Sequence, residues 1–142
     1  MSASPVLFVR AGARRVALPL DCLVEVIDPG PAVPVPAREP ALRGLARLRG
    51  RLVPLVHLGA LLDEAACPPA PGDAAVVIAI GTRRLCLEVE AVEEVARGDV
   101  VPLPAGEALP WATGVVRADG GLVPILDVPA LGGRLLEGGT PS

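Results

Sequence analysis

Short apolar runs separated by turn residues dominate this sequence. Val6–Arg10 and Ala75–Ile80 have the length of a strand, and each is followed by a glycine, an Arg-Arg pair and a second apolar run, at Val16–Leu20 and Leu85–Val89. Two apolar runs joined by a short polar turn are typical of a β-hairpin. The pattern therefore predicts one equivalent hairpin in each half of the chain.

A second hairpin is predicted later in each half. Asp119-Gly120 is a strong two-residue turn pair, because both central residues of such a turn need positive φ. The equivalent turn in the first half is Arg49-Gly50. The flanking strands are Val115–Ala118 with Leu122–Asp127, and Leu45–Leu48 with Leu52–Leu58.

Two kinds of residue modify this strand pattern. Pro54 and Pro124 fall inside predicted strands, and because proline has no N–H for a ladder we expect them at a sheet edge or a bulge. Acidic residues follow the first hairpin of each half. We expect Asp21 to cap a single helical turn and Glu90 to act through the helix dipole.

The two halves are related by an internal repeat. With a shift of 69 positions, Gly12–Ile27 matches Gly81–Ala96 at 6 of 16 residues, and with a shift of 70, Gly44–Leu62 matches Gly114–Gly132 at 8 of 19. Only about one position in nine would match by chance in this composition. We therefore expect one domain over residues 1–142, with halves at about 5–65 and 73–131 and a tail at 132–142.

The composition leaves little chemistry for catalysis. The 142 residues include no Lys, Asn, Gln or Tyr, all 13 cationic residues are Arg, and 51% of the chain is hydrophobic. Serine occurs only at positions 2, 4 and 142, and His57 is the one histidine. Acid–base and nucleophilic mechanisms of catalysis usually need a pair of such groups in contact. We therefore expect that this protein is not an enzyme.

Charge, hydropathy and cysteine content limit the classes of partner and the cellular location that we expect. A net charge of −3 argues against nucleic acid as a partner. The longest apolar run, Ala74–Ile80, is far shorter than the ~20 residues of a membrane span, and the N-terminus carries no secretion signal. Cys22, Cys67 and Cys86 are widely spaced without a CxxC pair, so we expect free thiols in the cytoplasm, no metal and no cofactor.

One segment carries a family resemblance. It is Gly44-Leu45-Ala46-Arg47-Leu48-Arg49-Gly50-Arg51-Leu52-Val53-Pro54-Leu55-Val56-His57-Leu58, a glycine followed by an Arg-Gly turn and a proline-containing apolar strand. Together with Leu18–Val26 upstream and Leu87–Val95 downstream, it resembles the CheW-like domain family over Val6 to about Leu131.

The resemblance implies an all-β fold of two tandem five-stranded SH3-like or OB-like barrels that share an apolar core, with one or two short helices. It also implies a non-enzymatic adaptor of a bacterial chemosensory array. Such an adaptor couples the cytoplasmic helical tips of chemoreceptors to the regulatory domain of a CheA-type histidine kinase. Receptor contact would use the groove between the halves, and kinase contact the barrel surfaces.

Three departures from the family pattern keep an alternative open. Arg47 stands where the family has Asn, His57 stands where it has Asp, and the tail Gly132–Ser142 is short and glycine-rich. A divergent member that binds receptor but not kinase, and modulates array assembly, is the alternative function.

The resemblance also suggests which residues form the protein interface. They are Arg49, Gly50, Gly44, Glu25, Leu23, Arg47 and Arg51. Arg49 at a hairpin tip offers a planar fork for a partner's carboxylate; the alternatives are a solvated turn residue or a pair with Glu25 of this chain. Gly44 and Gly50 are expected to serve close backbone approach and positive φ, respectively.

The other charged residues can be explained by a structural role as well as by a functional one. The arginines from Arg43 to Arg51 could face an anionic partner, or be balanced by Glu88, Glu90, Glu93 and Glu94 of the other half. His57 is expected to be a core or edge histidine rather than a ligand. Two other functions were weighed. A domain that binds proline-rich peptides or single-stranded nucleic acid would need several aromatic side chains, whereas this sequence has one Phe and one Trp. A hydrolase or transferase would need nucleophiles that it lacks.

Overall fold

Strands make up most of both halves of the chain. The computed structural model describes residues 4–36, 39–63, 74–103, 109–118, 121–133 and 135. The first half contains β1 (Ser4–Ala11), β2 (Arg14–Pro19), the 3-10 turn η1 (Leu20–Cys22), β3 (Leu23–Ile27), β4 (Leu42–Leu48), β5 (Arg51–His57) and α1 (Leu58–Leu62). The second half contains β6 (Ala74–Ile80), β7 (Arg83–Val89), β8 (Ala91–Gly98), β9 (Val100–Val101), β10 (Ala112–Ala118), β11 (Gly121–Leu126) and α2 (Val128–Gly132).

Each of the two sheets takes strands from both halves of the chain. The first barrel has the order β3-β6-β7-β5-β4, and the second barrel has the order β8-β1-β2-β11-β10-β9. The hairpin β1–β2 therefore lies in the sheet of the second half, and the hairpin β6–β7 lies in the sheet of the first. The two halves of the repeat are interlocked by this exchange of hairpins.

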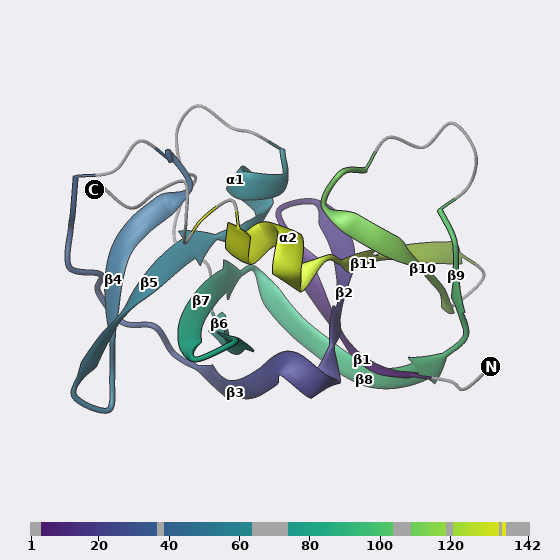
Figure 1. Ribbon diagram of the computed structural model, residues 1–142, viewed down its shortest axis with the longest axis horizontal. Coiled ribbons are helices and arrows are strands. Elements are labelled where there is room, and N and C mark those ends of the chain that lie inside the picture. The colour runs from purple at the N-terminus through teal and green to yellow at the C-terminus, as the bar shows by residue number, and fades with distance from the viewer. Residues whose placement is uncertain are drawn as a thin grey trace.

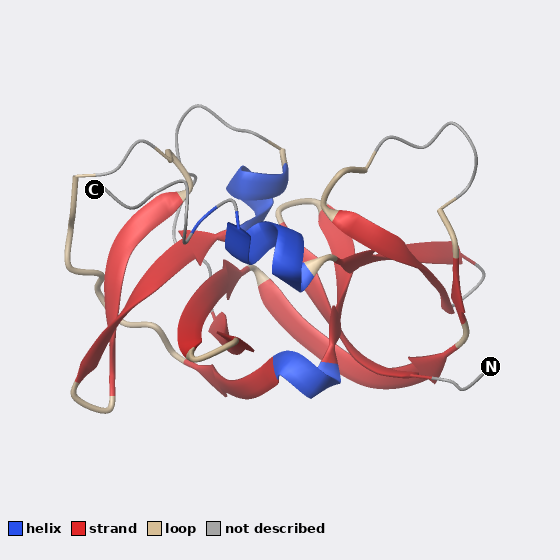
Figure 2. Ribbon diagram, in the orientation of Figure 1, coloured by secondary structure: helices blue, strands red, loops and turns tan. Residues whose placement is uncertain are grey.

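The two barrels lie at opposite ends of the molecule (Figure 1). Strands β4 and β5 mark one end and β9 and β10 the other, with α1 and α2 between them. Figure 2 shows that the helical segments are short and sit near the middle, while strands fill both ends. The all-β fold of two small barrels with short helices confirms the prediction from the sequence.

The apolar core has one shared part and one part inside each barrel. Leu7 and Val9 of β1 belong to the shared cluster, whereas Val6 and Phe8 point into the second barrel. Strand β6 repeats the arrangement, since Val76 packs in the shared cluster and its neighbours pack in the first barrel. A strand buried on both faces must be apolar at every position, which explains the unbroken apolar runs in the sequence.

Turn chemistry fixes the hairpin β4–β5. Arg49 has φ 49° and Gly50 has φ 80°, as the two-residue turn requires. The register pairs Leu48 with Arg51 and Arg47 with Leu52 on either side of it. The equivalent turn at Asp119-Gly120 lies outside the described residues.

Several local predictions need correction. Pro19, not Asp21, is the residue that precedes η1, and Asp21 lies inside that turn without a side-chain cap. Glu90 sits at a bend between β7 and β8, so no helix follows it. Strand β5 ends at His57 rather than Leu58, because His57 caps α1.

The strand prolines also differ from expectation. Pro54 and Pro124 lie on β5 and β11, which are central strands, and each is paired across its hairpin. The missing N–H is tolerated because the parallel ladders on the other side begin one residue later, at Leu55 and Ile125. None of the helices in the described residues is long and apolar enough to cross a membrane.

Candidate functional site

The hairpin tip of β4–β5 is tied to strand β3 by an ion pair. Arg49 Nη1 donates to Glu25 Oε2 at 2.6 Å, and Arg49 Nη2 donates to Glu25 Oε1 at 3.1 Å. The Arg49 side chain is 76% exposed and that of Glu25 is 23% exposed. The fork is therefore bound on one side to this chain and open to solvent on the other.

This ion pair joins the two ends of the first sheet. Strands β3 and β4 stand at opposite ends of its hydrogen-bonded order. In the second barrel the end strands β8 and β9 are consecutive in the chain, with Asp99 between them, so the backbone itself closes that sheet. In the first barrel the end strands are instead connected by the ion pair of Arg49 with Glu25 and by the proline-rich segment that follows β3.

That segment explains why glycine is needed at position 44. Val33 and Leu45 exchange backbone hydrogen bonds of 2.8 Å each, which lays the segment along β4. Gly44 has φ 138°, and a Cβ there would stand 2.2 Å from the Val33 carbonyl oxygen. The expected close backbone approach at Gly44 is thus confirmed, as is the positive φ at Gly50.

Three exposed apolar side chains come from strands that also carry the ion pair or adjoin its hairpin tip. Val24 and Val26 flank Glu25 along β3 and are 41% and 46% exposed, and Leu52 beside the hairpin tip is 53% exposed. We call Val24–Val26 with Arg47–Leu52 the docking region.

The exposed valines of β3 were not predicted from the sequence. In β3 the valines are exposed while the charged Glu25 is only partly exposed, which inverts the usual polarity of a surface strand. An acidic residue that alternates with valines ordinarily predicts buried valines and an exposed acid, so the sequence pattern did not indicate this surface. Leu23 itself packs against the shared core and contributes less to the surface.

The other arginines of this segment fall into two groups. Arg47 and Arg51 are exposed and have no acidic partner within the parts of the chain that are described. Arg43 is different, because its Nε donates to Glu88 Oε1 at 2.6 Å and the Glu88 side chain is only 3% exposed. The docking region therefore carries an excess of positive charge.

His57 has a structural role inside the fold. It is 1% exposed, its Nδ1 accepts a hydrogen bond from Ala60 N at 3.0 Å, and its Nε2 lies 2.7 Å from Glu90 Oε2. Since Nδ1 accepts, the ring proton is on Nε2 and is donated to Glu90. Asp127 at the equivalent position of the repeat caps α2 in the same way, by accepting from Ala130 N.

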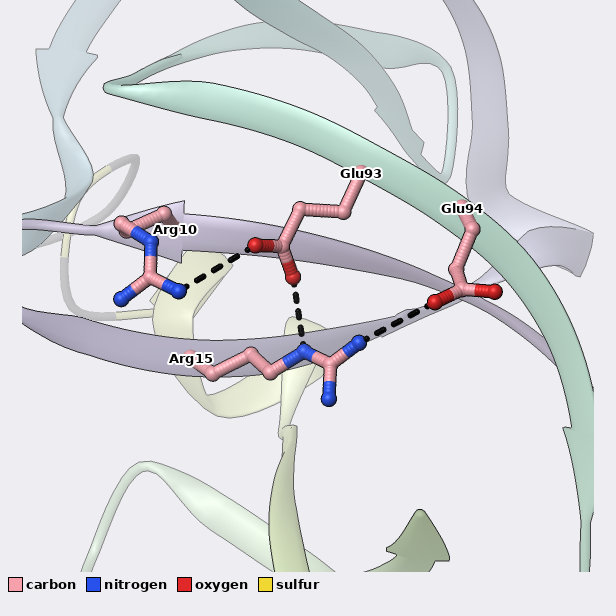
Figure 3. Close-up of polar contacts among 4 residues, drawn as sticks. All are labelled: Arg10, Arg15, Glu93 and Glu94. Atoms are coloured by element: carbon pink, nitrogen blue, oxygen red, sulfur yellow. Dashed lines mark hydrogen bonds and ion pairs between the residues drawn. The ribbon is translucent and has the colours of Figure 1, made fainter. Parts of the chain in front are cut away.

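The acids of β8 have partners in the second barrel, shown in Figure 3. Arg15 Nε donates to Glu93 at 2.7 Å, Arg15 Nη2 lies 3.3 Å from Glu94, and Arg10 lies 3.3 Å from Glu93. These acids therefore do not balance the arginines of the docking region. The expectation that glutamates of the other half balance these arginines is met by the pair of Arg43 with Glu88.

The remaining groups that could carry chemistry are metal-ligating side chains and the cysteine thiols. No three side chains of His, Cys, Asp or Glu gather as metal ligands among the described residues. Burial raises the pKa of the Cys22 thiol, and burial together with the nearby Glu25 raises that of Cys86 to about 11. Protonated thiols are poor nucleophiles. Cys67 lies outside the described residues.

Comparisons with known proteins agree with the fold. The profile of the CheW-like domain matches residues 5–135. The fold is similar to the crystal structure of the scaffolding protein TtCheW from Thermoanaerobacter tengcongensis, with a TM-score of 0.77 and 18% sequence identity over 90% of this chain and 86% of that chain. No curated protein matches the sequence.

Proposed function

The chain belongs to the CheW-like domain family, and from this premise we propose that it is a non-enzymatic adaptor of a bacterial chemosensory array. It acts in the cytoplasm and couples the helical tips of chemoreceptors to the regulatory domain of a CheA-type histidine kinase. The observation that carries this proposal is the docking region, in which an exposed Arg49 is held by Glu25 and the same strands expose Val24, Val26 and Leu52.

The chemistry of this region suits a helical partner with acidic and apolar side chains. Arg49 offers its remaining donors, and Arg47 and Arg51 add positive charge. Charge of this kind steers and orients a partner, while the exposed aliphatic side chains supply buried area. A site of this composition is suited to binding another protein.

The departure at His57 bears on the alternative function. Because His57 is buried and caps α1, its difference from the family pattern lies inside the fold and not on the docking region. Arg47 is a departure that lies on the surface, and most of the tail Gly132–Ser142 lies outside the described residues. This favours retained coupling to the kinase over a member that binds receptor alone.

The proposal is tested by titrating the full chain against a soluble receptor-tip fragment and, separately, against the kinase regulatory domain. We expect both to bind, and Arg49→Glu and Leu52→Asp to weaken receptor binding by about tenfold or more. The absence of receptor binding by the unaltered chain would refute the adaptor role. Receptor binding without kinase binding would establish the alternative function.

A matched control comes from the repeat. Leu122 occupies the position equivalent to Leu52 and is 50% exposed, compared with 53% for Leu52. Leu122→Asp therefore introduces the same charge in a similar environment on the second barrel. It should leave receptor binding unchanged, and circular dichroism should show that all three variants are folded.

A further inference from the structure

A single buried imidazole connects the two sheets beside α1. His57 ends β5 of the first sheet, and it is 1% exposed. Its Nε2 lies 2.7 Å from Glu90 Oε2, and the other oxygen of that carboxylate accepts from the backbone N–H of Gly12, in the turn between β1 and β2. His57 is therefore linked through one carboxylate to a hairpin of the second sheet.

The backbone of α1 lies directly against that hairpin turn. A Cβ at Gly59 would stand 2.6 Å from Gly12 N and 2.9 Å from the carbonyl carbon of Ala11. The residue that ends α1 is held as well, because Asp63 accepts from Arg14 Nη2 at 3.1 Å. Since α1 is fixed in this way along its length, a change at His57 acts on the first turn of the helix.

The cap that His57 provides depends on an unprotonated Nδ1. This nitrogen accepts from Ala60 N at 3.0 Å. An N–H in the first turn of a helix has no acceptor within the helix, so the lone pair of the imidazole satisfies it. An imidazolium carries a proton on both nitrogens and can only donate. Protonation would therefore set one N–H against another and break the cap.

The same protonation preserves the other contact of the ring. Nε2 keeps its proton and its place beside Glu90, and the hydrogen bond becomes an ion pair. Glu90 can continue to accept from Gly12 N. The two nitrogens of His57 thus respond differently to acid, because the contact with α1 is lost while the contact with the bend between β7 and β8 remains.

Other charged groups on the elements around this junction have partners of their own. They form the ion pairs Arg43 with Glu88, Arg14 with Asp63, and Arg10 with Glu93, while Glu39 accepts from Ala41 N. Glu88 is the ladder partner of His57 on β7. Because a cation offsets each of the paired acids, Glu90 is the carboxylate that the ring meets directly.

We propose that His57 is an acid-sensitive latch on α1. With a neutral ring the first turn of the helix is capped, and uptake of one proton from solvent at Nδ1 releases Ala60 N while Nε2 stays bound to Glu90. Histidine is the side chain that ordinarily changes charge between about pH 5 and 8. The latch is a property of the fold and does not depend on the adaptor role.

The second half of the chain supplies an internal reference. Asp127 stands at the position equivalent to His57, and its carboxylate caps α2 by accepting from Ala130 N at 3.1 Å. Carboxylates ordinarily titrate below the range in which histidine changes charge. The amide of Ala130 therefore reports on a cap of the same kind that lacks the imidazole.

Hydrogen exchange and NMR on the unaltered chain test the latch from about pH 8 to about pH 5. As the pH falls, the nitrogen resonances of the ring should show protonation of Nδ1. At the same midpoint the protection factor of the Ala60 amide should fall about tenfold, the value of a typical N-cap. The protection factors of Gly12, which donates to Glu90, and of Ala130 should stay constant.

Four outcomes would overturn the latch. Nδ1 could stay unprotonated down to the pH at which the whole chain unfolds, or the protection of Ala60 could remain unchanged when the ring is protonated. Joint loss of protection at Ala60 and Gly12 would assign the transition to Glu90. Joint loss at Ala60 and Ala130 would assign it to general destabilisation.

His57→Asn is the matched variant. Its side-chain oxygen can cap α1 and does not titrate, so Ala60 should keep the same protection across the whole range. A transition at Ala60 that persists in this variant would show that another group is responsible. The measurements on the unaltered chain decide the question without it, because they need no substitution.

Discussion

The guanidinium of Arg49 holds the carboxylate of Glu25 through two hydrogen bonds, and so connects strands that no backbone ladder joins. The contact spans 24 positions in the sequence and lies at the rim of the first barrel. It fixes the direction of a side chain that is otherwise exposed. Arg49 is therefore pre-oriented at the docking region before any partner arrives.

Arg49→Lys should separate orientation from stability. Lysine keeps the charge and loses the planar fork, so it cannot hold Glu25 at two points. Because exposed ion pairs contribute about 0–1 kcal/mol, urea denaturation should show a loss below about 1 kcal/mol. Receptor binding should fall more, by about tenfold, when measured by calorimetry.

The control for this prediction is Arg84→Lys. Arg84 is an exposed arginine on β7 whose guanidinium donates to the Arg83 carbonyl oxygen. We expect no effect on stability or on receptor binding. A loss of stability above about 2 kcal/mol in Arg49→Lys would instead assign Arg49 a structural role.

Gly44 and Gly50 should respond very differently to alanine. A Cβ at Gly44 would meet the backbone of Val33, so Gly44→Ala should lose about 3 kcal/mol or more, or prevent folding. A Cβ at Gly50 meets nothing within 4 Å, so Gly50→Ala should cost about 1–2 kcal/mol, for its left-handed backbone alone. Urea denaturation monitored by Trp111 emission measures both.

Asparagine supplies the control at the turn. It tolerates positive φ better than alanine, so Gly50→Asn should be close to neutral in stability. If Gly50→Asn and Gly44→Ala were equally destabilising, the clash with Val33 would not be the cause. If Gly50→Asn is neutral in stability, any loss of receptor binding in this variant reports on the surface and not on folding.

Because His57 caps α1, we expect substitutions at this position to differ in how much stability they cost. His57→Ala removes the acceptor for Ala60 N and the donor to Glu90, so it should lose about 2–4 kcal/mol. His57→Asp restores the cap that Asp127 provides in the other half, but it brings a second carboxylate toward Glu90. We expect it to be destabilised at neutral pH and to recover part of the loss in acid, in thermal melts.

His57→Asn should be the mildest of the three. Its side-chain oxygen can cap α1, and it adds no charge near Glu90. The matched variant Asp127→Asn should also be mild, because Asp127 makes the same cap contact. If His57→Ala were no worse than His57→Asn, the helix cap would not be what His57 contributes.

Cys86 predicts a loss of stability in alkaline solution. Burial, with Glu25 adding to it, raises the pKa of this thiol from 9.0 to about 11, so the folded state favours the protonated form. That contribution is complete below pH 9 and is lost as pH rises toward about 11. Cys86→Ala should flatten the alkaline part of a plot of unfolding free energy against pH.

Thiol labelling gives an independent check. Cys86 is fully buried and protonated at neutral pH, so the folded chain should label there only as fast as it opens. Labelling followed by mass spectrometry resolves Cys86 from the other cysteines. Rapid modification of Cys86 in the folded protein at pH near 7 would contradict the buried thiol.

The sequence by itself determined the hairpins and the repeat. The Arg49-Gly50 turn follows from two adjacent residues, because positive φ is a local property of the backbone. The continuous apolar run in β1 likewise indicated a strand, since burial on both faces leaves no polar position. Such features need only neighbours in the chain.

Only the tertiary structure decided which strands lie together and which charges meet. An identical hairpin pattern in each half fits either barrel, so the exchange of β1–β2 and β6–β7 cannot be deduced from the pattern. Glu25 could have met several arginines, and His57 several acids, because sequence carries no distance between residues far apart in the chain. The packing of two interlocked sheets brings Arg49 to Glu25 and Glu90 to His57, and this sets the docking region and the buried cap.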